Sequence, residues 1–163
     1  MPPLKLPPDS LDLAQILKAS GVKATVQRLE IYRELSGSMQ HPDAEAIYRG
    51  VRRRIPTVSL DTVYRTLLLF LKLGLVSSLR LPHERIRFDP NLTPHHHLVC
   101  TRCGRVQDFT HPDFDALKVP EAAQSWGVIE KMQVEIRGQC ERCARQTKPG
   151  RSRSLIQTKE EPK

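Results

Sequence analysis

Four stretches in the first half of the chain carry apolar residues at helical spacing, and each begins at a side chain that can cap a helix. The stretches end at residues or segments that stop a helix, namely Gly21, "SGS" at 36–38, Pro56 and Gly74. The pattern therefore predicts four helices, the last of them a strongly apolar helix at 60–73, with the capping residues Ser10, Thr25, Asp43 and Ser59.

Two short runs of alternating apolar and polar residues follow, "LVSSLRL" at 75–81 and "RIRFD" at 85–89, joined by "PHE". This alternation predicts a β-hairpin. Helices that close with a helix–turn–helix pair and are followed by a two-stranded wing are typical of a winged-helix DNA-binding domain, here at 10–88. The segment "DPNLTP" at 89–94 predicts a hinge to a second unit.

Residues 95–143 have a different pattern and predict a small α/β unit, so that the expected fold class is α+β. Strands are expected at 95–100, 105–109 and 128–138, with a "TRCG" turn between the first two and a short helix at 111–119. The proline-rich residues 1–9 are expected to be flexible. Residues 144–163 form a basic tail without periodicity, which we expect to be disordered.

The charge balance indicates a polyanionic partner. The 163 residues have a net charge of +8, and residues 1–90 contain 14 Lys and Arg against 9 Asp and Glu. Such a balance favours nucleic acid, although basic charge can also serve solubility alone. The longest nearly apolar run, 66–76, is too short to cross a bilayer, and the N-terminus has no export pattern. We therefore expect a cytoplasmic protein without a membrane partner.

The start of the fourth helix contains polar side chains that could enter a DNA groove. Recognition helices contact bases with their N-terminal residues, which here are Ser59, Thr62, Tyr64, Arg65 and Thr66. Tyr64 could instead pack in the core, and Arg65 could be a solvated charge. The run "RRR" at 52–54 is either a solvated helix end or a phosphate contact.

The four cysteines form two Cys-x-x-Cys pairs, Cys100 with Cys103 and Cys140 with Cys143. Each pair can direct two thiolates at one ion, and two pairs complete a tetrahedral structural zinc site. Two disulfides are disfavoured in a reducing compartment. A redox-active thiol pair is the other alternative, but two pairs and no further cysteine fit a metal better.

Three histidines precede the first cysteine pair. On a strand, His95 and His97 share one face while His96 and Cys100 lie on the other. His95 and His97 therefore predict a second metal site, for iron(II), manganese(II) or zinc. Asp89, Asp108 and His41 are candidates to complete it, although each also has an ordinary interpretation as a turn, surface or loop residue. His83 and His111 have no obvious partners and are expected to be surface residues.

Six motifs together resemble the ferric uptake regulator family of bacterial metal-dependent repressors, over about residues 12–143. They are "ATVQRLEIY", "HPDAEAIY", "SLDTVYRTLLLFLKLGLV", "IRFD", "HHHLVCTRCGRVQDF" and the final Cys-x-x-Cys pair. The resemblance implies a homodimer, with N-terminal winged helices and C-terminal α/β dimerisation domains, that grips a palindromic operator.

The resemblance is strongest to the peroxide-sensing branch, and it implies a regulatory iron or manganese site. The residues that match this branch's ligands are His41, Asp89, His95, His97 and Asp108. Iron-uptake members usually have glutamates at the two aspartate positions and a further histidine near Met132, which this chain lacks. The family often has proline where Val26 stands, and His96 is an additional candidate ligand.

The resemblance also implies a mechanism. The metal acts as corepressor, and with iron bound, hydrogen peroxide oxidises a ligand histidine, His41 or His95, and releases the DNA. Because the residue is consumed, this is sensing and not enzyme turnover. The alternatives are an iron-responsive repressor with iron(II) as corepressor and, from another class, a thiol-based redox protein. A hydrolytic metalloenzyme is disfavoured because no general base stands out and five ligands leave little room for a substrate.

Overall fold

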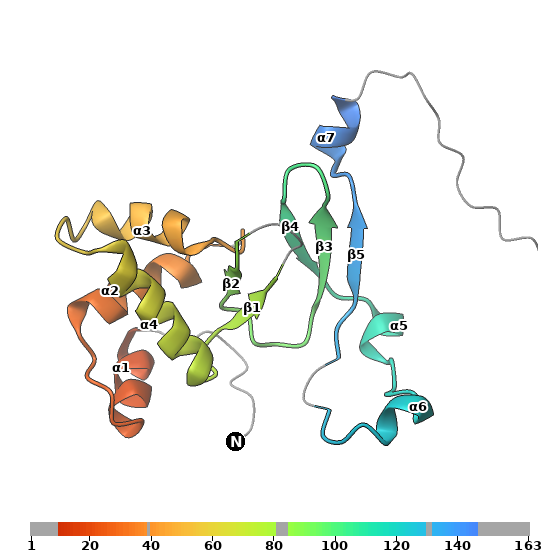
Figure 1. Ribbon diagram of the computed structural model, residues 1–163, viewed down its shortest axis with the longest axis horizontal. Coiled ribbons are helices and arrows are strands. Elements are labelled where there is room, and N and C mark those ends of the chain that lie inside the picture. Colours follow the sequence, from red (N-terminus) through yellow and green to blue (C-terminus); the bar gives the residue numbers. More distant parts are fainter. Residues whose placement is uncertain (1–9, 39, 81–84, 130–131, 147–163) are drawn as a thin grey trace, which may run out of the picture.

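The computed structural model describes residues 10–38, 40–80, 85–129 and 132–146 (Figure 1). Four helices make up the first half of the chain, on the left of Figure 1. They are α1 (Ser10–Ala19), α2 (Val26–Ser36), α3 (Ala44–Arg52) and α4 (Leu60–Lys72). The four predicted helices are confirmed, each with its end within a few residues of the expected position.

Local side-chain chemistry explains where three of these helices begin. Each capping side chain accepts a hydrogen bond from the backbone N–H three residues further on, at 3.4 Å for Thr25, 2.7 Å for Asp43 and 3.1 Å for Ser59. These bonds satisfy N–H groups that have no partner within the helix. Gly74, with φ of +67°, takes the left-handed conformation that ends α4.

The helices enclose one apolar core, which also receives a side chain from the wing. Tyr32 and Phe70 pack edge to face, with ring centroids 5.5 Å apart. Phe88, from the second strand of the hairpin, is fully buried in the same core. The hairpin is therefore fixed to the helices by burial of a large apolar side chain.

The wing is a short antiparallel pair, β1 (Ser77–Leu79) and β2 (Arg87–Asp89). Its strands are shorter than the predicted 75–81 and 85–89. Leu75 and Val76 are buried in the helical core instead, and residues 81–84 lie outside the described residues. Within β2, the backbone N–H of Phe88 donates to the carbonyl of Pro42 at 3.0 Å, which ties the wing to the loop before α3.

A three-stranded sheet, with the order β4-β3-β5, forms the second half of the chain. β3 (His96–Cys100) pairs antiparallel with β4 (Val106–Phe109) and parallel with β5 (Glu135–Gly138). The third predicted strand, at 128–138, is realised only at its C-terminal end, because β5 pairs only along the length of β3. Figure 1 shows β1 and β2 between the helices and this sheet.

Three short helices complete the described chain. α5 (Pro112–Asp115) realises only part of the predicted helix at 111–119, and α6 (Glu121–Gln124) and α7 (Glu141–Arg145) were not expected. α7 lies at the end of the sheet opposite α5 and α6 (Figure 1) and runs past the expected start of the tail at 144. Residues 1–9 and 147–163 are outside the described residues. Among the described helices, none combines the length and apolarity that a membrane span requires.

Candidate metal centres and DNA-binding face

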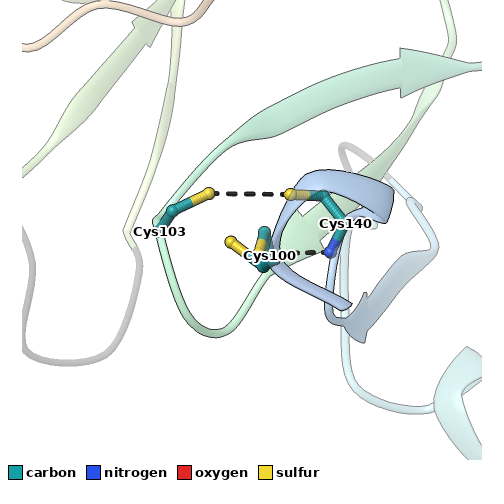
Figure 2. Close-up of side chains that lie close together, drawn as sticks. Cys100, Cys103 and Cys140 are labelled. Atoms are coloured by element: carbon teal, nitrogen blue, oxygen red, sulfur yellow. Dashed lines mark hydrogen bonds between the residues drawn. The ribbon is translucent and has the colours of Figure 1, made fainter. Parts of the chain in front are cut away.

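Four sulfur atoms converge where the β3–β4 turn meets the start of α7; Figure 2 shows three of them. The Sγ atoms of Cys100, Cys103, Cys140 and Cys143 all lie within 4.8 Å of one another, and those of Cys103 and Cys140 are 3.8 Å apart. A tetrahedral zinc ion with zinc–sulfur distances of about 2.3 Å spaces its sulfur atoms by about 3.8 Å. The four side chains therefore fit a zinc ion.

The thiols of this cluster differ in how readily they ionise. Backbone N–H groups of Cys140 and Cys103 lower the pKa of Cys100 to about 6, whereas burial raises the pKa of Cys143 to about 12. All four are free thiols in the structure. A divalent cation would allow all four sulfurs to ionise together, and the closed sulfur shell would leave no open position for redox chemistry.

A second cluster lies where the loop before α3, the end of β2 and the start of β3 meet. The Nε2 atom of His97 lies 2.9 Å from that of His95 and 3.2 Å from that of His41. Oδ2 of Asp89 is 3.0 Å from Nε2 of His95. These four side chains are buried, and their ligand atoms all lie within 4.8 Å of one another.

The fifth predicted ligand, Asp108 on β4, approaches the same point. Its Oδ1 atom is 2.9 Å from Nε2 of His41, 3.5 Å from that of His97 and 3.8 Å from that of His95. Its side chain is 35% exposed, whereas those of the other four are buried. Asp108, Asp89 and His41 line a groove of about 930 Å³, so the cluster has one side open to solvent.

The backbone at His41 is strained into position. Its φ of +47° lies in the left-handed region, where a residue with a Cβ atom is disfavoured by on the order of 1 kcal/mol. The loop is held there by Pro42, whose carbonyl accepts from β2, and by Asp43, which caps α3 and bridges to Arg87. The fold thus places the imidazole of His41 against β3.

The hydrogen bond of the outer ring nitrogen of His95 leaves its inner nitrogen available to a cation. Nδ1 of His95 lies 2.7 Å from the carbonyl of Thr93. Since a carbonyl only accepts, this nitrogen carries the proton, and Nε2 of the neutral ring has a free lone pair. Nδ1 of His97 contacts Nε2 of the Gln133 side chain; if the amide oxygen and nitrogen exchanged places, the oxygen would accept a hydrogen bond from Nδ1.

The charges around this second cluster suit a bound cation. Burial, with the neighbouring His95 and His41, lowers the pKa of His97 to about 4. Burial acts in the same direction on His95, but the hydrogen bonds to Asp89 and Thr93 and the charges of Asp89 and Asp108 together outweigh it and raise the pKa of His95. Burial would raise the pKa of Asp89, but the hydrogen bonds from His95 and Asn91 lower it. Imidazole and carboxylate ligands of this kind suit iron(II), manganese(II) or zinc.

His96 does not join this cluster. Its ring points to the other face of β3, where Nε2 is 3.0 Å from Oδ1 of Asp115 and Nδ1 accepts from the backbone N–H of Val134. His111 caps α5 and is exposed, and His83 lies outside the described residues. The expected alternation along β3 therefore separates His96 from the other two histidines.

The predicted DNA-contacting side chains lie along one end of α4. Ser59, Tyr64 and Arg65 are exposed and Thr62 is partly exposed, but Thr66 is buried, so its expected groove contact is wrong. The side chain of Arg65 pairs with Asp61 at 3.0 Å and is 78% exposed.

The predicted basic run at 52–54 does not act as a unit. Arg54 donates to Glu30 at 2.5 Å and to Glu34 at 2.7 Å, and this ion pair ties the end of α3 to α2. Arg52 stacks over Tyr48 and, like Arg53, is exposed. Only Arg52 and Arg53 therefore remain candidates for phosphate contact.

A winged-helix unit joined by a short hinge to a small sheet unit, with two clusters of metal-ligating side chains, defines a class of metal-binding winged-helix proteins. The sequence profile of the Ferric uptake regulator family matches residues 19–137 of this chain. The chain is also 34% identical over 131 residues to the peroxide operon regulator of Bacillus subtilis (strain 168), covering 80% of this chain and 90% of that protein. The chain belongs to the ferric uptake regulator family.

Solved structures of the same family share the fold. The Vibrio cholerae ferric uptake regulator matches with a TM-score of 0.66 and 30% identity, covering 79% of this chain and all of that one. The Campylobacter jejuni peroxide stress regulator matches with a TM-score of 0.63 and 29% identity, covering 80% and 98%. The predicted fold class, a winged-helix DNA-binding domain followed by an α/β dimerisation domain with a four-cysteine site, is confirmed.

Proposed function

We propose that this protein is a metal-dependent transcriptional repressor that senses hydrogen peroxide. The observation that carries the proposal is the convergence of His41, Asp89, His95, His97 and Asp108, in which both carboxylates come from aspartates. Similarity to a peroxide operon regulator supports it. The genes it controls are then those of oxidative stress and metal homeostasis, and the protein acts in the cytoplasm, where the DNA is.

The two clusters take different roles in this proposal. The four cysteines hold a structural zinc ion that staples the β3–β4 turn to α7. The histidine–aspartate cluster holds the regulatory iron(II) or manganese(II). Asp108 is 35% exposed and lines the adjoining groove, which gives a small oxidant access to the histidine–aspartate cluster, whereas four thiolates complete the shell of the zinc ion.

The regulatory ligands come from both halves of the chain, and this placement explains control of DNA binding. His41 precedes α3, Asp89 ends β2, and the other three ligands are on the sheet side of the hinge. When these residues bind a common ion, the position of the winged helix relative to the sheet is fixed. A ligand that binds one conformation better than another shifts the population towards it, so metal binding favours the DNA-binding conformation.

Peroxide sensing follows from oxidation of a ligand. Bound iron(II) supplies the activation of hydrogen peroxide. One oxygen atom of the peroxide replaces a ring C–H bond of His41 or His95 by C–OH, the other leaves as water, and the imidazole is oxidised by two electrons. His41 is buried but lines the groove, so the groove is the route by which peroxide would approach its ring. The altered imidazole no longer ligates well, and the domains separate. Since the histidine is consumed, the protein is not an enzyme.

A homodimer gripping a palindromic DNA operator completes the proposal. Repressors of this family are DNA-binding dimers. In this chain, Leu98 and Ile136 are register partners on neighbouring strands and are 38% and 42% exposed. β5 is an edge strand with all four residues exposed, and Trp126 and Val128, which precede it in the chain, are 85% and 89% exposed. Exposed apolar side chains such as Leu98 and Ile136, adjacent on one sheet face, are candidates for an interface.

Protein purified without oxygen tests the function directly. Loaded with iron(II), it should bind its operator, lose it after brief peroxide and gain one oxygen on His41 or His95; loaded with manganese(II), it should keep the operator. Tryptic peptide 34–49 also contains Met39, so the oxygen must be located by fragmentation, whereas peptide 88–102 has no methionine. Iron-loaded protein that keeps its operator through peroxide, with neither histidine gaining mass, is instead an iron-responsive regulator.

A further inference from the structure

The hinge residue Asn91 lies between the two carboxylates of the regulatory cluster. Its backbone N–H donates to Oδ1 of Asp89 at 2.8 Å, and its side-chain Nδ2 donates to Oδ2 of Asp108 at 3.3 Å. Asp89 ends β2 of the wing, whereas Asp108 is on β4 of the sheet. One residue therefore contacts a carboxylate from each half of the chain.

The orientation of the Asn91 amide is fixed by its other contacts. Its Oδ1 atom accepts from the backbone N–H of Thr93 at 3.1 Å and from the hydroxyl of Thr93 at 2.5 Å. A backbone N–H only donates, so the amide oxygen must face Thr93 and the NH₂ group must face Asp108. The carbonyl of Thr93 in turn accepts from Nδ1 of His95. The network thus reaches three of the five proposed ligands.

These bonds engage Oδ2 of Asp108 and Oδ1 of Asp89, the latter also lying 3.7 Å from Nε2 of His41. Oδ2 of Asp89 is 3.0 Å from Nε2 of His95 and also accepts from Ser77 at 3.2 Å. Oδ1 of Asp108 is 2.9 Å from Nε2 of His41. A charge-assisted hydrogen bond to the far oxygen opposes the rotation that would bring both oxygens onto one ion.

We propose that the side chain of Asn91 is a positioning group that keeps Asp108 in one-oxygen coordination, while the backbone N–H of the same residue holds Oδ1 of Asp89. The inference rests on the proposed function and deepens it. Two carboxylates that each gave one oxygen would leave an ion more coordination space than two carboxylates that each gave both. Asp108 is partly exposed, and its Oδ2 atom has no other hydrogen bond among the contacts described. Without the Asn91 side chain, Asp108 can therefore turn both oxygens to the ion and fill that space.

The test compares Asn91→Ala and Asn91→Asp with the control Gln107→Ala. Gln107 is an exposed amide next to Asp108, and its side chain accepts only from Arg105 among the contacts described. Asn91→Asp keeps the size of the side chain but replaces the donor by a like charge, so it serves if Asn91→Ala does not fold. Each protein is loaded with manganese(II) for its electron paramagnetic resonance spectrum and with iron(II) for the rate of mass gain on His41 and His95.

We expect both Asn91 variants to keep zinc and to bind manganese(II), with an altered manganese spectrum. Their rate of histidine oxidation should fall by about 10- to 100-fold, while Gln107→Ala matches wild type in both measurements. A wild-type spectrum together with a wild-type oxidation rate in the Asn91 variants overturns the inference. If wild type itself gains no oxygen, the peroxide function fails, and the manganese spectrum alone then decides the role of Asn91.

Discussion

The Nε2 atoms of His41 and His97 lie 3.2 Å apart, although 56 positions separate them in the chain. His41 belongs to the loop before α3, and His97 is on β3 of the sheet. Two neutral imidazoles that face each other by their inner nitrogens have at most one proton to share. A divalent cation between them would replace that contact by two ligand bonds and would fix the winged helix against the sheet.

Lengthening one carboxylate should separate metal binding from peroxide sensing. Asp89→Glu adds a methylene in a buried position and should favour two-oxygen binding, which fills the space that peroxide needs. We expect metal-dependent DNA binding to survive while the loss of DNA binding after peroxide is blunted, as measured by operator binding of the iron-loaded protein. Asp113→Glu, at an exposed aspartate, is the control. A full peroxide response in Asp89→Glu contradicts the role assigned to the short carboxylate.

Removing one cysteine should remove the zinc and with it the C-terminal fold. Cys140→Ser leaves three thiolates, and structural zinc sites contribute folding free energy directly. Metal analysis and size-exclusion chromatography should show zinc-free protein that is unfolded or monomeric. Thr101→Ser, in the exposed turn between Cys100 and Cys103, should keep its zinc. A stable, DNA-binding dimer of Cys140→Ser without zinc would refute the structural role.

Truncating Arg65 should weaken specific DNA binding and leave the dimer intact. Its side chain is exposed near the start of α4 and forms a surface pair with Asp61, which contributes little to stability. We expect specific binding to weaken by about 1–3 kcal/mol in a titration of operator DNA. Lys72→Ala, at the far end of the same helix, should bind as wild type. Equal affinities for Arg65→Ala and wild type would show that another surface reads the DNA.

A charge on the exposed face of the sheet should disrupt the dimer. Ile136→Glu places a carboxylate beside Leu98 on the edge strand pair, where burial in an interface would be costly. Sedimentation should show a shift to monomer and reduced DNA binding. Val26→Glu, at a residue that is 70% exposed on α2, is the control and should remain dimeric. A dimeric Ile136→Glu protein would place the interface elsewhere.

Manganese(II) affinity should fall as the pH is lowered. Because hydrogen bonding to Asp89 raises the pKa of His95, this ring is protonated below that raised value and must lose a proton to bind metal, whereas His97, with a pKa of about 4, is already neutral. We expect roughly tenfold weaker binding per pH unit below the His95 pKa, with proton release. Calorimetry in several buffers between about pH 6 and pH 8 measures both. Constant affinity without proton release would contradict this.

Local chemistry alone determined much of this protein. Thr25, Asp43 and Ser59 cap their helices through bonds to the N–H three residues on, so the helix starts could be predicted without knowledge of any distant contact. The turn that holds Cys100 and Cys103 is equally local. Alternation along a strand also placed His95 and His97 on one face and His96 on the other, since successive side chains of a strand point in opposite directions.

Only the tertiary structure decided which distant side chains meet. Packing between elements, which no periodicity specifies, decided three features of the structure. They are the burial of Thr66, the pairing of Arg54 with Glu30 and Glu34, and the contact of His96 with Asp115. The ligand set itself was expected from resemblance, but its geometry needed the strained loop at His41. The bonds from Asn91 to Asp89 and Asp108 were seen only in the tertiary structure. The "DPN" turn pattern predicts a bond within the hinge but does not predict a contact with Asp108 on β4, 17 positions away.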